Sequence, residues 1–361
     1  MLEQLKLQQP ELEALFVCDK VFEQQSRGLM QTVSFPVDVK TITAGKFRRY
    51  VHFKFWDYIE HFSIPIKNFF DLFRTGFGML QSLGIIWRFH PDVVLAKGGY
   101  VCLPMGLAAW LMRVPLVIHD SDTRPGLTNR ILARFASRIG TGTPLENYHY
   151  DARKTQYVGV PIDPSIHAVT DEQKRAFKKA LQLDEDNPLV VAVGGGLGSA
   201  LINQAILVLA QAPEFKEVNF YNVTGKSHYD AVRQHAAGVE NYIADPFVFG
   251  GMFKIFAAAD VVVTRASATT LQELAAAAKP VIAVPARQLG DQQKNAATFA
   301  ATGAVIAIKD DDLSTQLGPA IRSLLDDTAK AHSLADKIHS YARPDAARDM
   351  AAMVLAAVRL H

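Results

Sequence analysis

The chain carries the same strand–loop–helix–strand pattern twice. An apolar run starting at Asp92 is followed by a helical pattern and then by a second apolar run after Pro115. The order recurs from Asp260, with a helix and an apolar run after Pro280, at similar spacing. Short apolar runs that alternate with helices are typical of buried parallel strands joined by right-handed crossovers. The repeat therefore predicts two α/β domains of one type, each with a parallel sheet.

The length of 361 residues also favours two domains over one core. We place the boundary near Pro161, where the sequence VGVPIDPSI has two prolines close together. The expected division is a first domain over 1–161, a second over 162–343, and a C-terminal helix over 344–361 that packs back on the first domain. The strands expected in the first domain cover 12–18, 33–39, 93–96, 116–118, 138–141 and 155–158. Its expected helices cover 68–89, 104–112 and 126–136. In the second domain, a helix is expected over 313–339.

Composition narrows the class of protein only slightly. A hydrophobic content of 49% with 20% charged residues suits large globular cores. We expect no transmembrane helix, since no apolar run reaches the required length of about 18 residues, and the first residues lack the pattern of a signal peptide. Cys18 and Cys102 have no spacing typical of disulfides or metal sites.

Cations and aromatic residues are interleaved between Lys40 and Arg88. This mixture is typical of surfaces that bind nucleic acid or an anionic membrane. We expect no nucleic acid, because no signature of RNA or DNA binding accompanies the mixture, and we favour a membrane-facing region over Phe62–Trp87. The alternative is that the aromatic residues belong to the core and the cations to a solvated face.

Polar residues follow both apolar runs of the first repeat. Gly98, Gly99 and Tyr100 follow one run, and His119 and Asp122 bound the polar cluster after the other. Ligands of parallel sheets bind at the carboxyl ends of the strands, so these residues form a candidate site. The sequence Asp-Ser-Asp over 120–122 has the D-x-D spacing of some metal sites, but that spacing is common by chance, and we predict no metal.

The second half contains two turns suited to phosphate. One is Gly-rich, over 194–198, and includes Gly195 and Gly196; glycines allow close backbone approach to a ligand, although an ordinary tight turn explains them equally well. The other precedes a helix, and its small and hydroxyl residues leave backbone N–H groups for a diphosphate. The residues expected there are Ala268, Thr269, Thr270, Leu271 and Gln272.

Three further polar residues suit a nucleotide sugar. Glu273 lies one turn into the helix, where a carboxylate can accept both ribose hydroxyls, or can simply favour the helix dipole. The amides of Gln292 and Gln293 suit sugar hydroxyls; the alternative is an exposed helix start with Asp291 as its N-cap.

Five motifs in order resemble the MurG family: GGYVCLPMGLAAW, PLVIHDSDTRPGLTNRILARFA, VVAVGGGLGSALINQ, ADVVVTRASATTLQELAAAAKPVIAVP and GDQQKNA. The resemblance implies the GT-B fold, two Rossmann-like doubly wound domains facing a central cleft. It implies transfer of GlcNAc from UDP-GlcNAc to undecaprenyl-pyrophosphoryl-MurNAc-pentapeptide, by a protein peripheral to the cytoplasmic face of the cell membrane.

The resemblance also implies residue roles. Phe249 would grip uracil through its backbone, Glu273 would take the ribose, and 268–272 the diphosphate. Gln292 and Gln293 would contact the GlcNAc hydroxyls. Gly98–Tyr100 and His119–Asp122 would face the acceptor pyrophosphate and the donor sugar. No cofactor is implied; Mg²⁺ is possible but no bound site is predicted.

Two departures from the family pattern bear on catalysis. Asp122 stands where the family has an amide, and the family's first strand and G-G-T-G-G-H loop have no counterpart here. We expect roughly 20–30 residues upstream of Met1, because a doubly wound sheet without its central strand has two unpaired edges. The catalytic base is therefore left unassigned, with Asp122 as a possible contributor. The alternatives are a GT-B enzyme with another acceptor or UDP-sugar, and a sugar-nucleotide-binding half-site subunit that needs a partner.

Overall fold

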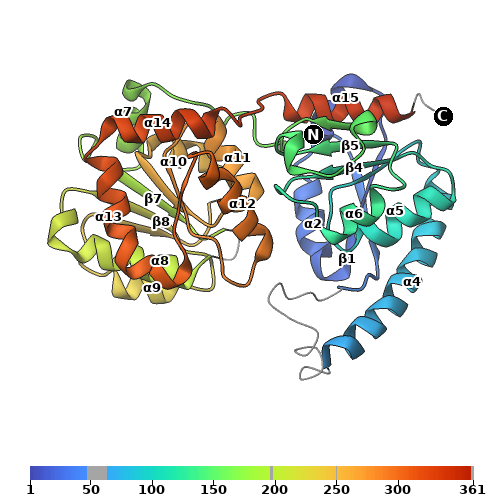
Figure 1. Cartoon of the computed structure of the whole chain (residues 1–361), viewed down its shortest axis with the longest axis horizontal. Helices are drawn as coiled ribbons and strands as arrows, with labels where there is room; N and C mark the ends of the chain where they lie inside the picture. Colours follow the sequence, from blue (N-terminus) through green and yellow to red (C-terminus); the bar gives the residue numbers. More distant parts are fainter. Residues whose placement is uncertain (47–62, 196–197, 249, 359–361) are drawn as a thin grey trace. The chain divides into compact units, whose positions relative to one another are not determined.

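The computed structural model of the chain describes residues 1–46, 63–195, 198–248 and 250–358. The chain divides into two compact units. Unit 1 combines Met1–Pro161 with Asp345–His361, and unit 2 is Ile162–Pro344. The chain thus leaves unit 1 once, builds all of unit 2, and returns to unit 1 with its last helix (Figure 1).

Unit 2 is built on a six-stranded parallel sheet in the order β12-β11-β10-β7-β8-β9. Strand β7 lies inside the sheet, later strands are added on both sides of it, and this arrangement is that of a doubly wound Rossmann fold. The strands are β7 (Leu189–Val193), β8 (Asn219–Val223), β9 (Tyr242–Asp245), β10 (Val261–Thr264), β11 (Val281–Ala283) and β12 (Ile306–Ala307).

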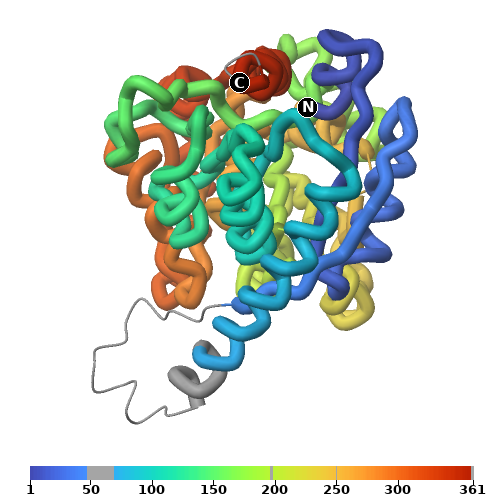
Figure 2. The backbone as a smooth tube through the Cα atoms, turned by 90° about the vertical axis from the view of Figure 1, so that its right-hand side faces the viewer, coloured from blue at the N-terminus to red at the C-terminus, as the bar shows by residue number. Residues whose placement is uncertain are grey.

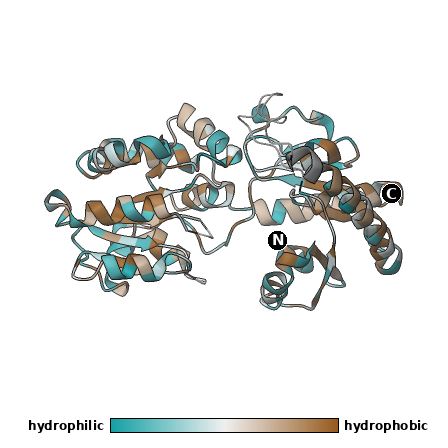
Figure 3. Cartoon of the chain, turned by 90° about the horizontal axis from the view of Figure 1, so that it is seen from below, coloured by the Kyte–Doolittle hydropathy of each residue, from teal (hydrophilic) through white to brown (hydrophobic). Residues whose placement is uncertain are grey.

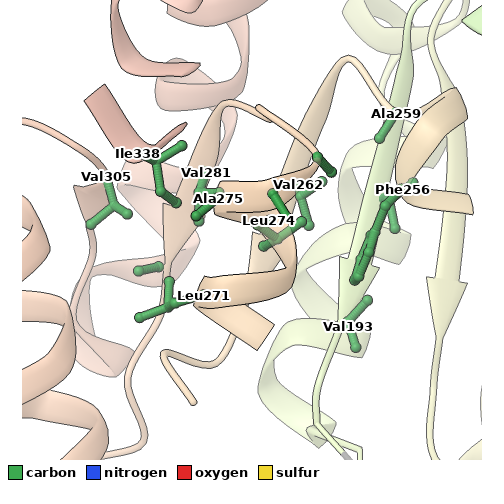
Figure 4. Packing of buried hydrophobic residues seen from close by; sticks show 14 of the residues in the cluster. Val193, Phe256, Ala259, Val262, Leu271, Leu274, Ala275, Val281, Val305 and Ile338 are labelled. Carbon is green, nitrogen blue, oxygen red and sulfur yellow. The ribbon is translucent and has the colours of Figure 1, made fainter. Parts of the chain in front are cut away.

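Helices cover both faces of this sheet, so its strands are apolar on both sides. Val191 and Val193 of β7 belong to one core cluster, whereas Val190 and Ala192 belong to another. Figure 4 shows the first cluster, in which Leu271 and its neighbours lie near Val281. The helices are α7 (Asp171–Ala180), α8 (Ala200–Gln211), α9 (Tyr229–His235), α10 (Met252–Ala258), α11 (Ala268–Ala276), α12 (Gly290–Ala301), α13 (Leu313–Leu325) and α14 (Thr328–His339).

The strands of unit 1 form two parallel sheets instead of one. The first sheet pairs β1 (Ala14–Asp19) with β2 (Val37–Ile42), and the second has the order β3-β4-β5-β6. Within the described residues, β1 pairs only with β2, and β3 pairs only with β4. The two unpaired edges expected from the sequence are therefore present. The strands of the second sheet are β3 (Val94–Ala96), β4 (Leu116–Asp120), β5 (Arg138–Thr141) and β6 (Thr155–Tyr157).

Shared apolar clusters join these two sheets into one layer. Val17 of β1 and Val94 of β3 pack against the same cluster, which includes Ile86 and Met105 from two helices. Helix α15 (Ala346–Val358) packs on α1 (Leu2–Gln8), β4 and β5. The remaining helices are α2 (Glu23–Met30), α4 (Ser63–Phe89), α5 (Cys102–Leu111) and α6 (Leu127–Leu132). Figure 2 shows α4 running out beyond the body of unit 1, and Figure 3 shows helices of both units with mixed hydrophilic and hydrophobic residues.

Several predicted elements need correction. The single helix predicted over 313–339 is wrong, because α13 ends at Leu325 and α14 begins at Thr328. Asp327 is the N-cap of α14, and its side chain accepts a hydrogen bond from the Lys330 N–H. The strand predicted over 33–39 begins only after Pro36, and the helix predicted over 126–136 ends at Leu132. Helices α1, α2 and α9 were not predicted, since they are short and their patterns are weak.

Candidate functional site

The first candidate site lies at the point in the sheet of unit 2 where the strand order reverses. Strands β8 and β9 extend from one side of β7, and β10 to β12 extend from the other. The chain leaves β7 into the Gly-rich turn and leaves β10 into the turn before α11. In doubly wound sheets this position forms a crevice that binds ligands. The structure thus brings together the two turns that the sequence analysis singled out in this half.

The Gly-rich turn depends on its glycines. Gly195 and Gly198 have φ values of 82° and 78°, in the region that favours glycine. A Cβ on Gly194 would lie 2.3 Å from the backbone nitrogen of Ser199. Ser199 is the N-cap of α8. This close approach packs the Gly-rich turn against the start of α8. Gly196, which was also predicted to bind substrate, lies outside the described residues.

The start of α11 offers main-chain donors rather than side chains. Ser267 is the N-cap, and its hydroxyl accepts a hydrogen bond from the Thr270 N–H. Ala268 and Thr269 occupy the first turn. Leu271 is fully buried and Gln272 nearly so, at 0% and 3% exposure. The side chains of these last two residues therefore cannot reach a ligand, and the Leu271 N–H already donates to the Ser267 carbonyl at 3.0 Å.

Glu273 is a half-buried carboxyl group in α11. Burial, and secondarily the nearby charge of Asp163, raise the pKa of Glu273 to about 7. A carboxyl group with this pKa is stabilised as a carboxylate by hydroxyl donors, such as the two hydroxyls of a ribose. Its environment fits the predicted role.

Gln292 and Gln293 both brace the loop before α12. The Gln292 side-chain oxygen accepts a hydrogen bond from Ala286 N–H at 3.0 Å, and the Gln293 side-chain nitrogen donates to the Arg287 carbonyl at 2.7 Å. One polar atom of each side-chain amide is thus hydrogen-bonded within the protein, which fixes the orientation of the amide. Phe249, the predicted uracil contact, lies outside the described residues.

Arg265 was missed by the sequence analysis, and it joins the separate parts of this crevice. Its guanidinium donates to Ser199 Oγ at 2.7 Å, to the Val284 carbonyl at 2.9 Å and to Asp310 Oδ1 at 2.5 Å. Both partners of the ion pair are about one-tenth exposed. A buried, charge-assisted hydrogen bond of this kind is stronger than a neutral one and fixes the segments that it joins. The only sequence signal was an arginine directly after an apolar strand.

The second candidate site lies in unit 1, at the carboxyl ends of β3 and β4. Gly98 and Gly99 have φ values of 85° and 81°, so only glycine fits this turn without strain. Cys102 Sγ donates to the Gly98 carbonyl at 2.7 Å, which ties the turn to the start of α5. Tyr100 completes the turn and is partly buried.

His119 is a packed residue rather than an exposed ligand. Its side chain is fully buried, and its Nε2 bonds to the Gly159 carbonyl at 2.8 Å. Because a carbonyl only accepts, Nε2 carries the proton, and Nδ1 is left to accept from Ser121 Oγ at 3.2 Å. Burial lowers the pKa of His119 to about 4. The His119 ring therefore cannot face a substrate and instead orders the loop that follows, whereas a substrate contact through the backbone of the His119–Asp122 loop stays a prediction.

Asn129 is a second residue that the sequence analysis missed. It is 2% exposed, its side-chain nitrogen donates to the His119 carbonyl at 3.2 Å, and a Cβ on Gly98 would meet that same nitrogen at 3.3 Å. Its Oδ1 has no hydrogen-bond partner among the residues that the structure covers. Asn129 thus links the turn after β3 to the loop after β4.

The two carboxylates of the D-x-D sequence differ in environment. Asp120 is 3% exposed and accepts a hydrogen bond from the Tyr150 hydroxyl at 2.7 Å, whereas Asp122 is only partly buried. The Asp122 carbonyl accepts from the Tyr148 hydroxyl at 2.6 Å. With one carboxylate committed inside the fold, this pair does not fit a shared metal ion.

Helix α4 carries an exposed apolar surface. Seven of its large apolar side chains are between 56% and 66% exposed. An apolar surface of this length, with Arg74 and Arg88 on the same helix, is unusual for a face that meets only water. Among the described residues, none of the helices is both long and apolar enough to cross a membrane. The residues of the α4 apolar surface are Phe69, Phe70, Leu72, Phe73, Phe77, Leu80 and Trp87.

The two α/β units, each with parallel strands, have the GT-B fold in which glycosyltransferases are found. The structure resembles MurG from Acinetobacter baumannii, with a TM-score of 0.71 at 21% identity over 98% of this chain and 94% of that one. It also resembles CalG4, the calicheamicin glycosyltransferase, with a TM-score of 0.66 at 13% identity over 98% of this chain and 93% of that one.

Sequence comparison specifies the family. Residues 2–141 and 189–350 match the N-terminal and C-terminal domains of glycosyltransferase family 28. A relative from Geobacillus kaustophilus is 34% identical over 279 residues, which is 76% of this chain and 72% of that protein. A Listeria monocytogenes relative is 29% identical over 99% of this chain and 95% of its own length. Both are UDP-N-acetylglucosamine–N-acetylmuramyl-(pentapeptide) pyrophosphoryl-undecaprenol N-acetylglucosamine transferases. The chain belongs to the MurG family.

Proposed function

We propose that the protein transfers GlcNAc from UDP-GlcNAc to undecaprenyl-pyrophosphoryl-MurNAc-pentapeptide in peptidoglycan synthesis, with inversion at the anomeric carbon. The relatives named above carry this activity in their names. The observation that carries the proposal is the crevice at the ends of β7 and β10. A helix begins after each of these strands, and α11 carries the half-buried carboxyl group of Glu273. That combination suits a nucleotide diphosphate with a free ribose.

The nucleotide part of the donor would be held by unit 2. The N–H groups at the start of α11 would bind the diphosphate, and Glu273 would accept the ribose hydroxyls. An acceptor hydroxyl attacks the anomeric carbon as the bond to UDP breaks, so negative charge grows on the departing diphosphate. N–H groups fixed by the N-cap Ser267 would stabilise that charge without rearrangement.

The acceptor hydroxyl must lose its proton in the same step. His119 does not suit the role of base, because its Nε2 proton is committed to the Gly159 carbonyl and its ring is fully buried. We keep Asp122, which is partly exposed, as a possible contributor. We also propose that the reaction uses no resident metal or cofactor, since Asp120 is committed to Tyr150; transfer that survives a chelator would support this.

The α4 apolar surface would rest on the cytoplasmic face of the cell membrane, where the lipid-linked acceptor is anchored. Its aromatic side chains suit the interface between headgroups and acyl chains, and the arginines on the same helix suit anionic lipid. Part of the predicted region, Phe62 included, lies outside the residues whose side chains are described. Trp110 and Leu111, at the end of α5, are also exposed, at 51% and 55%.

The test is incubation of the purified chain with UDP-GlcNAc and a short-chain analogue of the acceptor, with product detected by mass spectrometry. A disaccharide product supports the proposal and rules out a half-site subunit that needs a partner. UDP-GlcNAc binding without any product would contradict it. Other UDP-sugars, offered in competition, would reveal a different donor preference.

A further inference from the structure

The loop that follows β4, called the β4 loop (121–123), rests on the segment between β5 and β6. Strands β4 and β5 are parallel neighbours, so the segments that leave them start at the same edge of the sheet. The Gly142 N–H donates to the Asp120 carbonyl at 2.8 Å. A Cβ on Gly142 would lie 2.6 Å from the Ser121 carbonyl oxygen. The two segments are therefore in direct contact, and the position of one constrains the other.

Tyr148, in the segment between β5 and β6, holds the β4 loop through its hydroxyl. The hydroxyl donates to the Asp122 carbonyl at 2.6 Å and lies 3.0 Å from Thr143 Oγ1. Because the one hydroxyl proton of Tyr148 goes to Asp122, Tyr148 accepts in its contact with Thr143. Asn147 Nδ2 in turn donates to Thr143 Oγ1 at 3.3 Å. Three hydrogen bonds thus run in one direction and end on the backbone of Asp122.

Tyr150 holds the residue directly before the β4 loop. Its hydroxyl donates to Asp120 Oδ2 at 2.7 Å. The rings of Tyr148 and Tyr150 are stacked, with their centres 5.7 Å apart and their planes 13° apart. Burial raises the pKa of both hydroxyls, so each keeps the proton that it donates. The two tyrosines, stacked on each other and bonded on both sides of Ser121, are called the tyrosine brace.

The β4 loop has a second support, from the ring of His119. Its Nδ1 accepts from Ser121 Oγ at 3.2 Å. The histidine and the tyrosine brace together leave the loop little freedom to move. Asp122, which is partly exposed, belongs to this fixed loop. Groups that meet a reacting sugar need placement to within about 0.5 Å, and supports of this kind provide it.

We propose that Tyr148 and Tyr150 are positioning residues for the glycosyl transfer, because the tyrosine brace sets the place of Asp122 against the reacting sugars. The inference rests on the proposed function for the identity of the reaction. Each tyrosine would act through the β4 loop and not by contact with a substrate. Loss of a hydroxyl leaves a buried acceptor without its donor and lets the loop shift. The rate of transfer should then fall while the affinity for the nucleotide holds, since unit 2 would bind the nucleotide.

The test compares tyrosine variants of the full chain. Tyr148→Phe and Tyr150→Phe each remove one hydroxyl and keep the stacked rings. The matched control is Tyr242→Phe, because Tyr242 is 8% exposed, close to the 7% of Tyr148, and its hydroxyl accepts from Asn222 Nδ2 at 2.7 Å. Tyr242 is the first residue of β9, at the end of the strand away from the crevice. The measurements are kcat and KM for both substrates, the melting temperature, and UDP affinity by calorimetry.

The kcat should fall about tenfold in Tyr148→Phe and in Tyr150→Phe, with UDP affinity unchanged. Tyr242→Phe should keep its kcat, although its melting temperature should fall by about 2–4 °C, as that of Tyr148→Phe does. A kcat of Tyr148→Phe equal to that of the control would overturn the proposal. If Tyr148→Phe does not fold, Thr143→Val replaces it, because this variant removes the group that orients the Tyr148 hydroxyl. Its kcat should fall about threefold, and an unchanged kcat would overturn the proposal.

Hydrogen exchange separates this inference from the proposed function, because it needs no turnover. The amides of the β4 loop should exchange faster in Tyr148→Phe than in the unaltered chain, and Tyr242→Phe should leave them unchanged. Faster exchange in a chain that makes no disaccharide would support the tyrosine brace and contradict the transfer reaction. Disaccharide formation at the same kcat in both brace variants would do the reverse.

Discussion

The affinity for UDP-GlcNAc should fall as the solution is acidified through neutral pH. Glu273 has a pKa raised to about 7 by burial and by Asp163, and a ribose needs the ionised form as its acceptor. Binding therefore favours the carboxylate and releases a proton wherever the free protein is protonated. UDP-GlcNAc is the right ligand, because its diphosphate does not titrate in this range, unlike the terminal phosphate of UDP.

The size of the effect follows from that pKa. With a free-protein pKa of about 7 and a much lower value in the complex, the dissociation constant rises about tenfold from about pH 8 to about pH 6. This is a loss of about 1.4 kcal/mol. Calorimetry in two buffers of different ionisation enthalpy measures both the affinity and the proton released.

Two variants isolate the cause. Glu273→Gln should bind more weakly at every pH and lose the pH dependence. Asp163→Asn removes the like charge but keeps an oxygen for Ser165, whose N–H and Oγ lie at 2.9 Å and 2.8 Å, so its pH profile should shift to lower pH. An affinity that is the same at both pH values, with no buffer-dependent heat, would refute the reasoning.

Three other perturbations should separate local roles. Gly98→Ala places a side chain at positive φ and 3.3 Å from a buried amide. The free energy of unfolding, measured by thermal denaturation, should therefore fall by about 1–2 kcal/mol. Arg265→Met leaves Asp310 buried without its cation and should reduce the free energy of unfolding by roughly 3–5 kcal/mol in denaturant titrations, whereas a change below about 1 kcal/mol would contradict the network. Phe73→Ser combined with Phe77→Ser removes exposed side chains, so the melting temperature should hold while sedimentation with anionic vesicles decreases; unchanged sedimentation would rule out α4 as the contact.

The sequence predicted most of the sheet of unit 2 because its strands are buried on both faces. Every residue of β7 is buried, and such runs need no long-range information to be recognised. The turns after β7 and β10 were also predicted, since glycines and hydroxyl residues follow these strands directly.

Local sequence patterns could not predict contacts between residues that are far apart in the sequence. His119 resembles a ligand at a strand end, but its partner Gly159 is 40 residues further along. Arg265 binds groups 66 and 45 residues away, at Ser199 and Asp310. The tyrosine brace joins segments that follow two different strands. Each of these is decided by the folded chain, whose distant parts become neighbours only after the sheet forms.

The packing of α15 on α1 has a consequence for biosynthesis. Unit 2 occupies one continuous stretch, whereas Leu5 of α1 shares a core cluster with Met350 and Val354. On the ribosome, domains fold as units once their residues have emerged. Unit 2 can therefore complete its core while unit 1 still lacks one of its covering helices. Unit 1, which is begun first, is therefore the last to be completed.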